Sequence, residues 1–305
     1  MFEFDDMNIA LCTDENFVIP CLTCITSILE NNKDDECHVF VLTEGLTEYS
    51  VEKFKKLSVC YSQTIDVRTI ETDRLRGLKV RPPFPVSMYF RFLLPEILNE
   101  EEKVLYLDCD IIVRHSLSDM YNMDLTEKSC AVVIDQHCDD VLMQNNVRIR
   151  SSYFNSGVML MNLDYWRKNN VANNLINYIY NNPERCIYPD QDALNIVLDS
   201  KVEYLNPTYN FQHYWAVSFH LSKTSYLRHK EIIEASKDPV IVHFCSQKPW
   251  HVKCYNPYKG EFYKYNKLHS FVGDAMKNKV FRTIMYKLFN RINLISEDLA
   301  SKYNK

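Results

Sequence analysis

KVLYLDCDIIV, residues 103–113, is an apolar run interrupted by two carboxylates, Asp108 and Asp110, that are spaced one residue apart. In a strand, side chains alternate between the two faces, so we expect both carboxylates on the same face. Two carboxylates at the end of a buried strand repel each other unless a positive charge lies between them. A divalent cation that prefers oxygen ligands, Mg²⁺ or Mn²⁺, is the simplest such charge. Because a bound cation can in turn hold a diphosphate, the stretch predicts a metal and nucleotide-sugar site.

Predicted strands and helices alternate along the chain around this stretch. Strands are expected over 9–12, 38–42, 65–67, 130–135 and 240–244, and helices over about 14–30 and 47–57. Such alternation favours a parallel, doubly wound sheet, in which ligands bind beyond the carboxyl ends of the strands. The loop 13–16 and the two carboxylates would both lie at such ends, so two separate segments predict one cleft.

Composition sets limits on the class of protein. The chain has 305 residues, 46% of them apolar, enough for one large α/β domain or two modest ones. Its net charge of −5 provides no general attraction to nucleic acid, so we expect no nucleic-acid partner. Its 11 cysteines are an odd number, and the opening MFEFDD is acidic where a secretory signal would be basic. These features predict reduced thiols and a cytoplasmic protein, either soluble or peripherally membrane-bound.

Six short motifs in a fixed order extend the interpretation of the two carboxylates. They are LCTDENF (11–17), YFR (89–91), VLYLDCD (104–110), YFNSGV (153–158), PDQDALN (189–195) and HFCSQKPWH (243–251). In this order they resemble the motifs of the family-8 retaining glycosyltransferases, which include bacterial lipooligosaccharide galactosyltransferases and, more distantly, glycogenin. The resemblance covers roughly residues 7–260. It implies an α/β fold of the GT-A nucleotide-diphospho-sugar transferase type, a Rossmann-like mixed sheet flanked by helices. The residue pattern beyond it adds C-terminal amphipathic helices to the expected fold.

The resemblance implies a metal and diphosphate site. Asp108, Asp110 and His243 would be the ligands of Mn²⁺, with Mg²⁺ as the alternative ion. Lys248 would neutralise the diphosphate as a compact point charge. The alternatives are a hydrogen-bonded core histidine at position 243 and a solvated surface lysine at position 248.

The resemblance also places the nucleotide. Thr13, Asp14, Asn16 and Phe17 would contact the uridine and its ribose, with the Phe17 ring stacked on uracil, and Cys109 would lie beside the nucleotide between the two carboxylates. From the sequence alone, Asp14 could equally be a helix cap, and both roles are compatible.

Five residues are implied on the sugar side. Arg91 would be a donor-site residue, Asn155, Asp190 and Gln191 would contact the donor sugar near its reacting carbon, and Asp135 would face the acceptor. The alternatives are an ion pair for Arg91, an N-cap for Asp190 and an ordinary strand-end aspartate for Asp135. Gln191 is a poor nucleophile, which favours front-side substitution with retention, and Asp190 remains the candidate for a covalent route.

The implied activity is transfer of a hexose from UDP-galactose or UDP-glucose to a hydroxyl of a glycan or glycolipid, as in synthesis of lipopolysaccharide or another cell-surface polysaccharide. Two alternatives stay open. One is a phosphatase of the haloacid dehalogenase type, which also uses an Asp-x-Asp pair at a strand end. The other is a nucleotide-sugar-binding protein without catalysis. Residues 207–240 match no motif of the family, and their aromatic side chains could stack on an acceptor sugar or belong to the core.

The C-terminal segment differs in composition from the rest of the chain. Between positions 277 and 291 there are five basic residues and no acidic one, and apolar residues recur at helical spacing. This pattern is typical of a basic amphipathic helix, which could lie on an anionic membrane surface or pack its apolar face on the domain. We therefore expect a glycosyltransferase catalytic domain over 1–260 and a helical tail over 261–305, with the protein peripheral on the inner face of the membrane.

Overall fold

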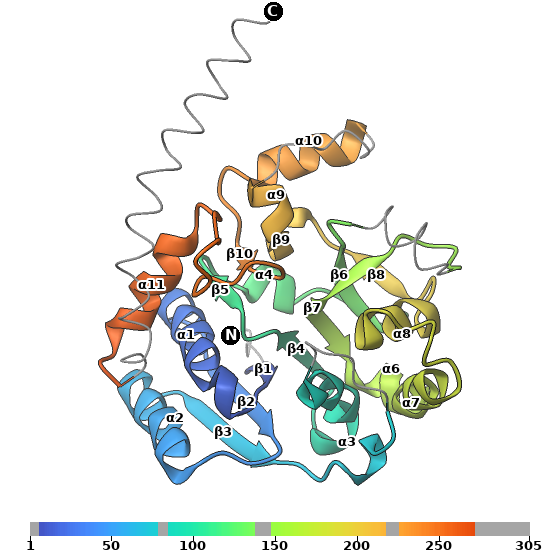
Figure 1. Ribbon diagram of the computed structural model, residues 1–305, viewed down its shortest axis with the longest axis horizontal. Helices are drawn as coiled ribbons and strands as arrows, with labels where there is room; N and C mark the ends of the chain where they lie inside the picture. The colour runs from blue at the N-terminus through green and yellow to red at the C-terminus, as the bar shows by residue number, and fades with distance from the viewer. Residues whose placement is uncertain (1–5, 79–84, 138–147, 218–225, 272–305) are drawn as a thin grey trace, which may run out of the picture.

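The computed structural model describes residues 6–78, 85–137, 148–217 and 226–271 (Figure 1). The strands in these ranges are β1 (Met7–Cys12), β2 (Cys37–Thr43), β3 (Thr64–Thr69), β4 (Lys103–Leu107), β5 (Ile111–Val113), β6 (Cys130–Ile134), β7 (Phe154–Asn162), β8 (Val202–Tyr204), β9 (Phe211–Gln212) and β10 (Ile241–His243). The α-helices are α1 (Val18–Asn31), α2 (Glu48–Tyr61), α3 (Leu94–Ile97), α4 (Ser118–Tyr121), α6 (Leu163–Lys168), α7 (Val171–Asn181), α8 (Pro189–Val197), α9 (His213–Val217), α10 (Tyr226–Ala235) and α11 (Lys259–Leu268). Short 3-10 helices are η1 (Glu15–Phe17), η2 (Asp73–Leu75), η3 (Val86–Leu93) and η4 (Pro207–Asn210).

A seven-stranded mixed sheet forms the centre of the molecule, in the order β3-β2-β1-β4-β7-β6-β8. Strands β3, β2, β1 and β4 run parallel to one another, as the alternation of strands and helices predicts. Strand β7 is antiparallel to both β4 and β6. The mixed sheet implied by the family resemblance is therefore confirmed, and a purely parallel sheet is wrong.

A second sheet has three strands in the order β5-β10-β9. Its strand β5 follows shortly after the end of β4 in the chain. The stretch 103–113 is divided between the two sheets: β4 belongs to the first and β5 to the second, with Asp108 and Asp110 in the turn between them. The prediction of one continuous strand with two carboxylates on one face is wrong. The carboxylates lie close together because the chain turns from one sheet into the other.

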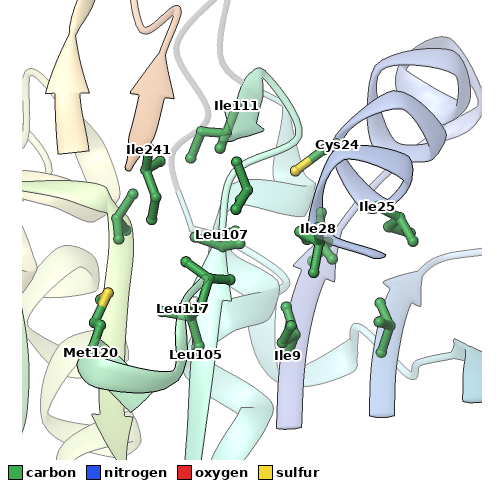
Figure 2. Close-up of a cluster of buried hydrophobic side chains, with 14 of the residues drawn as sticks. Ile9, Cys24, Ile25, Ile28, Leu105, Leu107, Ile111, Leu117, Met120 and Ile241 are labelled. Carbon is green, nitrogen blue, oxygen red and sulfur yellow. The ribbon is translucent and has the colours of Figure 1, made fainter. Parts of the chain in front are cut away.

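Both faces of the large sheet are covered by helices, and alternate strand residues enter two separate cores. One core packs α1 and α2 against residues such as Ile9, Leu105 and Leu107, and it also includes residues of the small sheet. Figure 2 shows the side chains of α1 beside those of β1 and β4, and Ile241 of the small sheet belongs to the same cluster. The other core packs η3, α3, α6, α7 and α8 against the opposite face. The two sheets and the helices thus form one packed unit that fixes the strand ends.

Helix α11 straddles the proposed domain boundary at residue 260. Its buried residues Phe262 and Tyr265 pack with Ile112 of β5 and Phe244, which follows β10. Figure 1 shows α11 lying alongside α1, and the Asn266 side chain donates to the Thr23 hydroxyl of α1 at 3.0 Å. The boundary itself stays a prediction, and the predicted basic helix over 277–291 lies outside the described residues. Within the described ranges, no helix combines the length and apolar character needed to cross a bilayer.

Candidate active site

Three potential metal ligands meet where the two sheets adjoin. Asp108 follows β4, Asp110 precedes β5 and His243 is the last residue of β10. One ligand atom from each lies within 4.8 Å of the other two. The Nε2 atom of His243 is 3.4 Å from Oδ1 of Asp110 and 3.8 Å from Oδ2 of Asp108. Asp110 and His243 are buried, whereas the Asp108 side chain is 28% exposed, so the cluster opens to solvent on the Asp108 side.

A network of amides determines which nitrogen of His243 faces the carboxylates. The carbonyl oxygen Oδ1 of Asn155 accepts from the main-chain N–H of Gly157 and from Nδ2 of Asn210, both at 3.0 Å. With its amide nitrogen engaged there, Asn210 presents Oδ1 to Nδ1 of His243 at 3.1 Å, and this oxygen can only accept. Nδ1 therefore carries a proton, and Nε2 is the ring nitrogen that faces Asp108 and Asp110. A ring nitrogen and two carboxylates facing one another suit a divalent cation between them.

Glycine at position 157 leaves the space that this cluster occupies. A Cβ atom there would lie 2.3 Å from Cε1 of His243 and 2.6 Å from Oδ2 of Asp108. Carbon atoms in ordinary contact are about 3.5–4.0 Å apart, so no larger residue fits without moving a ligand. The donor set, its orientation and the space beside it all fit Mn²⁺ or Mg²⁺.

Arg91 connects the potential metal ligands to the residues predicted to contact the donor sugar. It is buried on η3, and its guanidinium donates to Oδ1 of Asp108 at 3.0 Å and to the main-chain oxygen of Ser156 at 2.6 Å. The same guanidinium lies 3.4 Å from Asp190 and over the ring of Tyr106. The ion-pair alternative for Arg91 is thus present in the structure, and its partners are two predicted site residues.

Helix α8 presents the predicted donor-sugar residues. Asp190 lies in its first turn after the cap residue Tyr188, so the N-cap alternative for Asp190 is wrong. Burial raises the pKa of Asp190, and the nearby Arg91 opposes that shift. The Gln191 amide is held at both ends: its oxygen accepts from the Ser156 N–H at 3.0 Å, and its nitrogen donates to Asp135 at 3.3 Å. Gln191 is therefore fixed in one orientation.

The acceptor-side candidate Asp135 belongs to the same network. Its Oδ2 atom accepts from Nδ2 of Asn155 at 3.0 Å as well as from Gln191, and its Oδ1 atom accepts from the N–H of His137 at 2.7 Å. Continuous hydrogen bonds thus run from His243 through Asn210, Asn155 and Asp135 to Gln191.

The predicted nucleotide loop lies after β1. Asp14 accepts from the N–H groups of Asn16 and Phe17 at 2.8 and 3.1 Å, so it is a helix cap, as one reading of the sequence proposed. Phe17 is partly buried and meets the Trp250 ring edge-on at 5.8 Å between centroids. The hydroxyl of buried Thr13 donates to the main-chain oxygen of Asp14 at 3.2 Å.

The side chains of Cys109 and Lys248, both predicted near the nucleotide, point in different directions. The Cys109 side chain is buried and donates to the main-chain oxygen of Cys12 at 3.3 Å, so it points into the core. The Lys248 ammonium forms an ion pair with Asp110 and is only 20% exposed. The solvated-lysine alternative for Lys248 is therefore wrong.

Most of the chain matches the model of one protein family. The glycosyl transferase family 8 model matches residues 8–254. The chain belongs to glycosyltransferase family 8. General stress protein A of Bacillus subtilis is 28% identical over 265 residues, covering 85% of this chain and 92% of the relative. The lipopolysaccharide 1,3-galactosyltransferase of Salmonella typhimurium is 28% identical over 257 residues, covering 81% and 74%.

Solved structures confirm the expected fold. The crystal structure of the galactosyltransferase LgtC with donor and acceptor sugar analogs superposes with a TM-score of 0.78 at 23% identity, covering 90% of this chain and all of LgtC. The family 8 chain therefore has the GT-A type of fold that the motifs imply, and it is a glycosyltransferase.

Sequence reasoning missed three residues that support the site of this glycosyltransferase. Asn210 orients His243, and Tyr106 donates to Oδ1 of Asp108 at 2.7 Å. Asn195 joins α8 to the start of β7: its side chain accepts from the Phe154 N–H at 2.7 Å and donates to the Phe154 main-chain oxygen at 2.9 Å. Tyr106 and Asn195 lie inside the motifs quoted above and could have been considered as hydrogen-bond partners of the site. Asn210 lies in the segment that matched no motif and carries no local signal.

Proposed function

We propose that this protein is a Mn²⁺-requiring, retaining hexosyltransferase that moves galactose or glucose from its UDP-sugar to a hydroxyl of a glycan or glycolipid. The observation that carries the proposal is the largely buried cluster in which Nε2 of His243 and two carboxylates face one another. Relatives named as lipopolysaccharide glucosyl- and galactosyltransferases support a hexose donor and a cell-surface polysaccharide acceptor. A pathway of lipopolysaccharide type is thus the proposed setting.

Asp108, Asp110 and His243 would hold the cation, and Mg²⁺ is the alternative to Mn²⁺. A bound cation supplies electrostatic stabilisation to the diphosphate as its bond to the sugar breaks. Lys248 lies against Asp110, so its ammonium is already positioned to add a second positive charge beside that diphosphate. In the nucleotide loop, Thr13, Asp14, Asn16 and Phe17 are proposed to contact uridine.

The sugar-side residues support retention by front-side attack. Gln191 is held by Ser156 and Asp135, and an amide oxygen stabilises positive charge on the sugar carbon but is a weak nucleophile. Asp190 has its Oδ2 atom engaged by Arg91 and by the Ser156 hydroxyl at 3.2 Å, which reduces its availability as a nucleophile. In the proposed reaction the acceptor hydroxyl attacks the face that UDP leaves, and the departing phosphate oxygen takes its proton.

We further propose that the protein works in the cytoplasm on the inner face of the membrane. The support is compositional: the segment 277–291 carries five basic residues, no acidic one and apolar residues at helical spacing. Binding of the full chain to anionic vesicles but not to neutral ones tests this part independently of catalysis.

The test of the activity is calorimetric titration of the protein with UDP, with and without Mn²⁺, with a phosphomonoester as control ligand. Mn²⁺-dependent UDP binding, followed by release of UDP from UDP-galactose or UDP-glucose, supports the proposal. Absence of UDP binding in saturating Mn²⁺ would overturn it. Hydrolysis of the phosphomonoester would point instead to a phosphatase, and UDP-sugar binding without turnover with any acceptor would point to a binding protein.

A further inference from the structure

Lys259, in the first turn of α11, is an almost completely buried lysine that the site described above does not include. The residue is 1% exposed, and its Nζ atom donates to the main-chain oxygen of His251 at 3.0 Å. Lysine is almost never fully buried unless partners replace the water that hydrates its ammonium. The position of this charge against one loop is therefore a specific feature of the fold.

The loop that Lys259 contacts is the one that carries Lys248. The His251 N–H donates to the Lys248 main-chain oxygen at 2.8 Å, and the Lys248 N–H donates to Nδ1 of His251 at 3.2 Å. These two hydrogen bonds close residues 248–251 into a compact turn. At one end of the turn the Lys248 side chain reaches Asp110, and at the other end Lys259 holds the His251 carbonyl.

Helix α11 holds the same turn at two further points. The Tyr263 hydroxyl donates to the Pro249 main-chain oxygen at 3.1 Å, and the rings of Phe262 and Trp250 are 5.6 Å apart. The helix is itself fixed to α1 through the hydrogen bond between Asn266 and Thr23. The turn therefore rests on a rigid support and not on the flexible stem of Lys248 alone.

We propose that Lys259 is a positioning residue for Lys248. It fixes the 248–251 turn so that the Lys248 ammonium stays beside the metal-binding carboxylates, where the diphosphate of UDP binds. The inference rests on the proposed function, because it assigns the diphosphate to Lys248. The hydrogen bond from Lys259 to the His251 carbonyl is the contact through which this effect would reach Lys248.

The experiment measures binding of UDP, uridine and MnCl₂ to the full chain by calorimetry. Replacement of Lys259 by Met keeps the apolar stem and removes the ammonium. Loss of a buried charged hydrogen bond of this kind is expected to weaken UDP binding about tenfold. Affinity for uridine is expected to stay at its wild-type value, because uridine carries no diphosphate for Lys248 to neutralise. Affinity for Mn²⁺ is expected not to fall, because Lys248 is the cationic partner of Asp110 and not a metal ligand. Lys264→Met, an exposed lysine on the same helix, is the matched control and should bind all three ligands normally.

A double-mutant cycle distinguishes positioning from a general structural role. If Lys259 acts through Lys248, the variant Lys248→Met/Lys259→Met binds UDP no more weakly than Lys248→Met alone. Additive losses, or wild-type UDP affinity in Lys259→Met, would overturn the inference. If Lys259→Met does not fold, Tyr263→Phe tests the inference instead. Its affinity for UDP is expected to fall about threefold while its affinity for uridine is unchanged. An equal loss of affinity for uridine would refute the inference. Failure of the wild-type protein to bind UDP would instead refute the proposed function.

Discussion

Replacing Gly157 by Ala is the sharpest perturbation of the candidate metal centre. The added methyl group would lie 2.3 Å from Cε1 of His243 and 2.6 Å from Oδ2 of Asp108. Both atoms belong to proposed metal ligands, and no unusual backbone angle at Gly157 adds strain of its own. The substitution therefore tests the space between the ligands without removing any of them.

The size of the effect follows from these distances. To restore an ordinary carbon–carbon contact, the His243 ring must move by about 1 Å, whereas metal–ligand distances tolerate only about 0.2 Å. His243 is buried and held by Asn210, so the ring cannot move without breaking that hydrogen bond. We expect Mn²⁺ affinity to fall about 100-fold, at the upper end for loss of ligand orientation. Overpacking of this kind should also lower the free energy of unfolding by about 1–3 kcal/mol.

The assay is calorimetric titration with MnCl₂, followed by UDP titration in excess Mn²⁺, with thermal unfolding of the same samples. Gly260→Ala is the matched control, because a Cβ atom at this position on α11 meets no atom within 4 Å. This control should bind Mn²⁺ normally and gain up to about 1 kcal/mol in stability from better helix propensity. A folded Gly157→Ala protein with wild-type Mn²⁺ affinity would refute the assignment of the three ligands.

Three further predictions address the ligands, their orientation and a buried carboxyl group. Asp110→Ala should keep the fold and lose Mn²⁺-dependent UDP binding, so normal UDP titration with Mn²⁺ would contradict the metal assignment. Asn210→Ala should weaken Mn²⁺ binding about 10- to 100-fold by freeing the His243 ring; nitrogen NMR of the imidazole should show mixed tautomers, and an unchanged Nδ1–H tautomer with unchanged Mn²⁺ affinity would count against the network. Burial raises the pKa of Asp192 from 3.8 to about 6, although hydrogen bonds from Tyr153 and the backbone oppose the shift. Because folding favours the protonated carboxyl, this contribution to the free energy of unfolding is complete below pH ~4 and falls by about 3 kcal/mol as the pH rises through ~6. Urea unfolding across this range should show that decline, and Asp192→Asn should remove it; the same slope in both proteins would contradict the shift.

Much of the site could be predicted because its residues occur in short motifs with a chemical reason for each position. Asp108 and Asp110 predict a nearby positive charge because they are close in sequence, and His243 ends an apolar strand beside them. The nucleotide loop follows a buried strand, so its place at the sheet edge follows from the direction of a parallel sheet. These inferences use only local sequence and the rule that the carboxyl ends of parallel strands lie at the same edge of a sheet.

Features that depend on contacts between distant segments could not be predicted locally. Strand β7 is buried along almost its whole length, and nothing in its residue pattern signals its direction, so its antiparallel pairing with β4 was not evident. The chain turn at Asp108 could not be recognised because the apolar residues on both sides read as one strand. Asn210 acquires its role only when η4 and β10 are brought together in space.

The junction of the two sheets explains why such an unfavourable set of ligands can be held in place. Asp108 is attached to β4 of the large sheet, where its N–H donates to the Gly157 carbonyl at 2.9 Å, whereas His243 is paired through its backbone with Ile111 of the small sheet. Each ligand is therefore positioned by strand hydrogen bonds and a buried core that do not depend on the ligands themselves. The charge of the carboxylates is further offset by Arg91 beside Asp108 and by Lys248 beside Asp110, and both sheets are packed into one core. A cation bound to the three proposed ligands would connect the two sheets, so metal binding is expected to stabilise their junction.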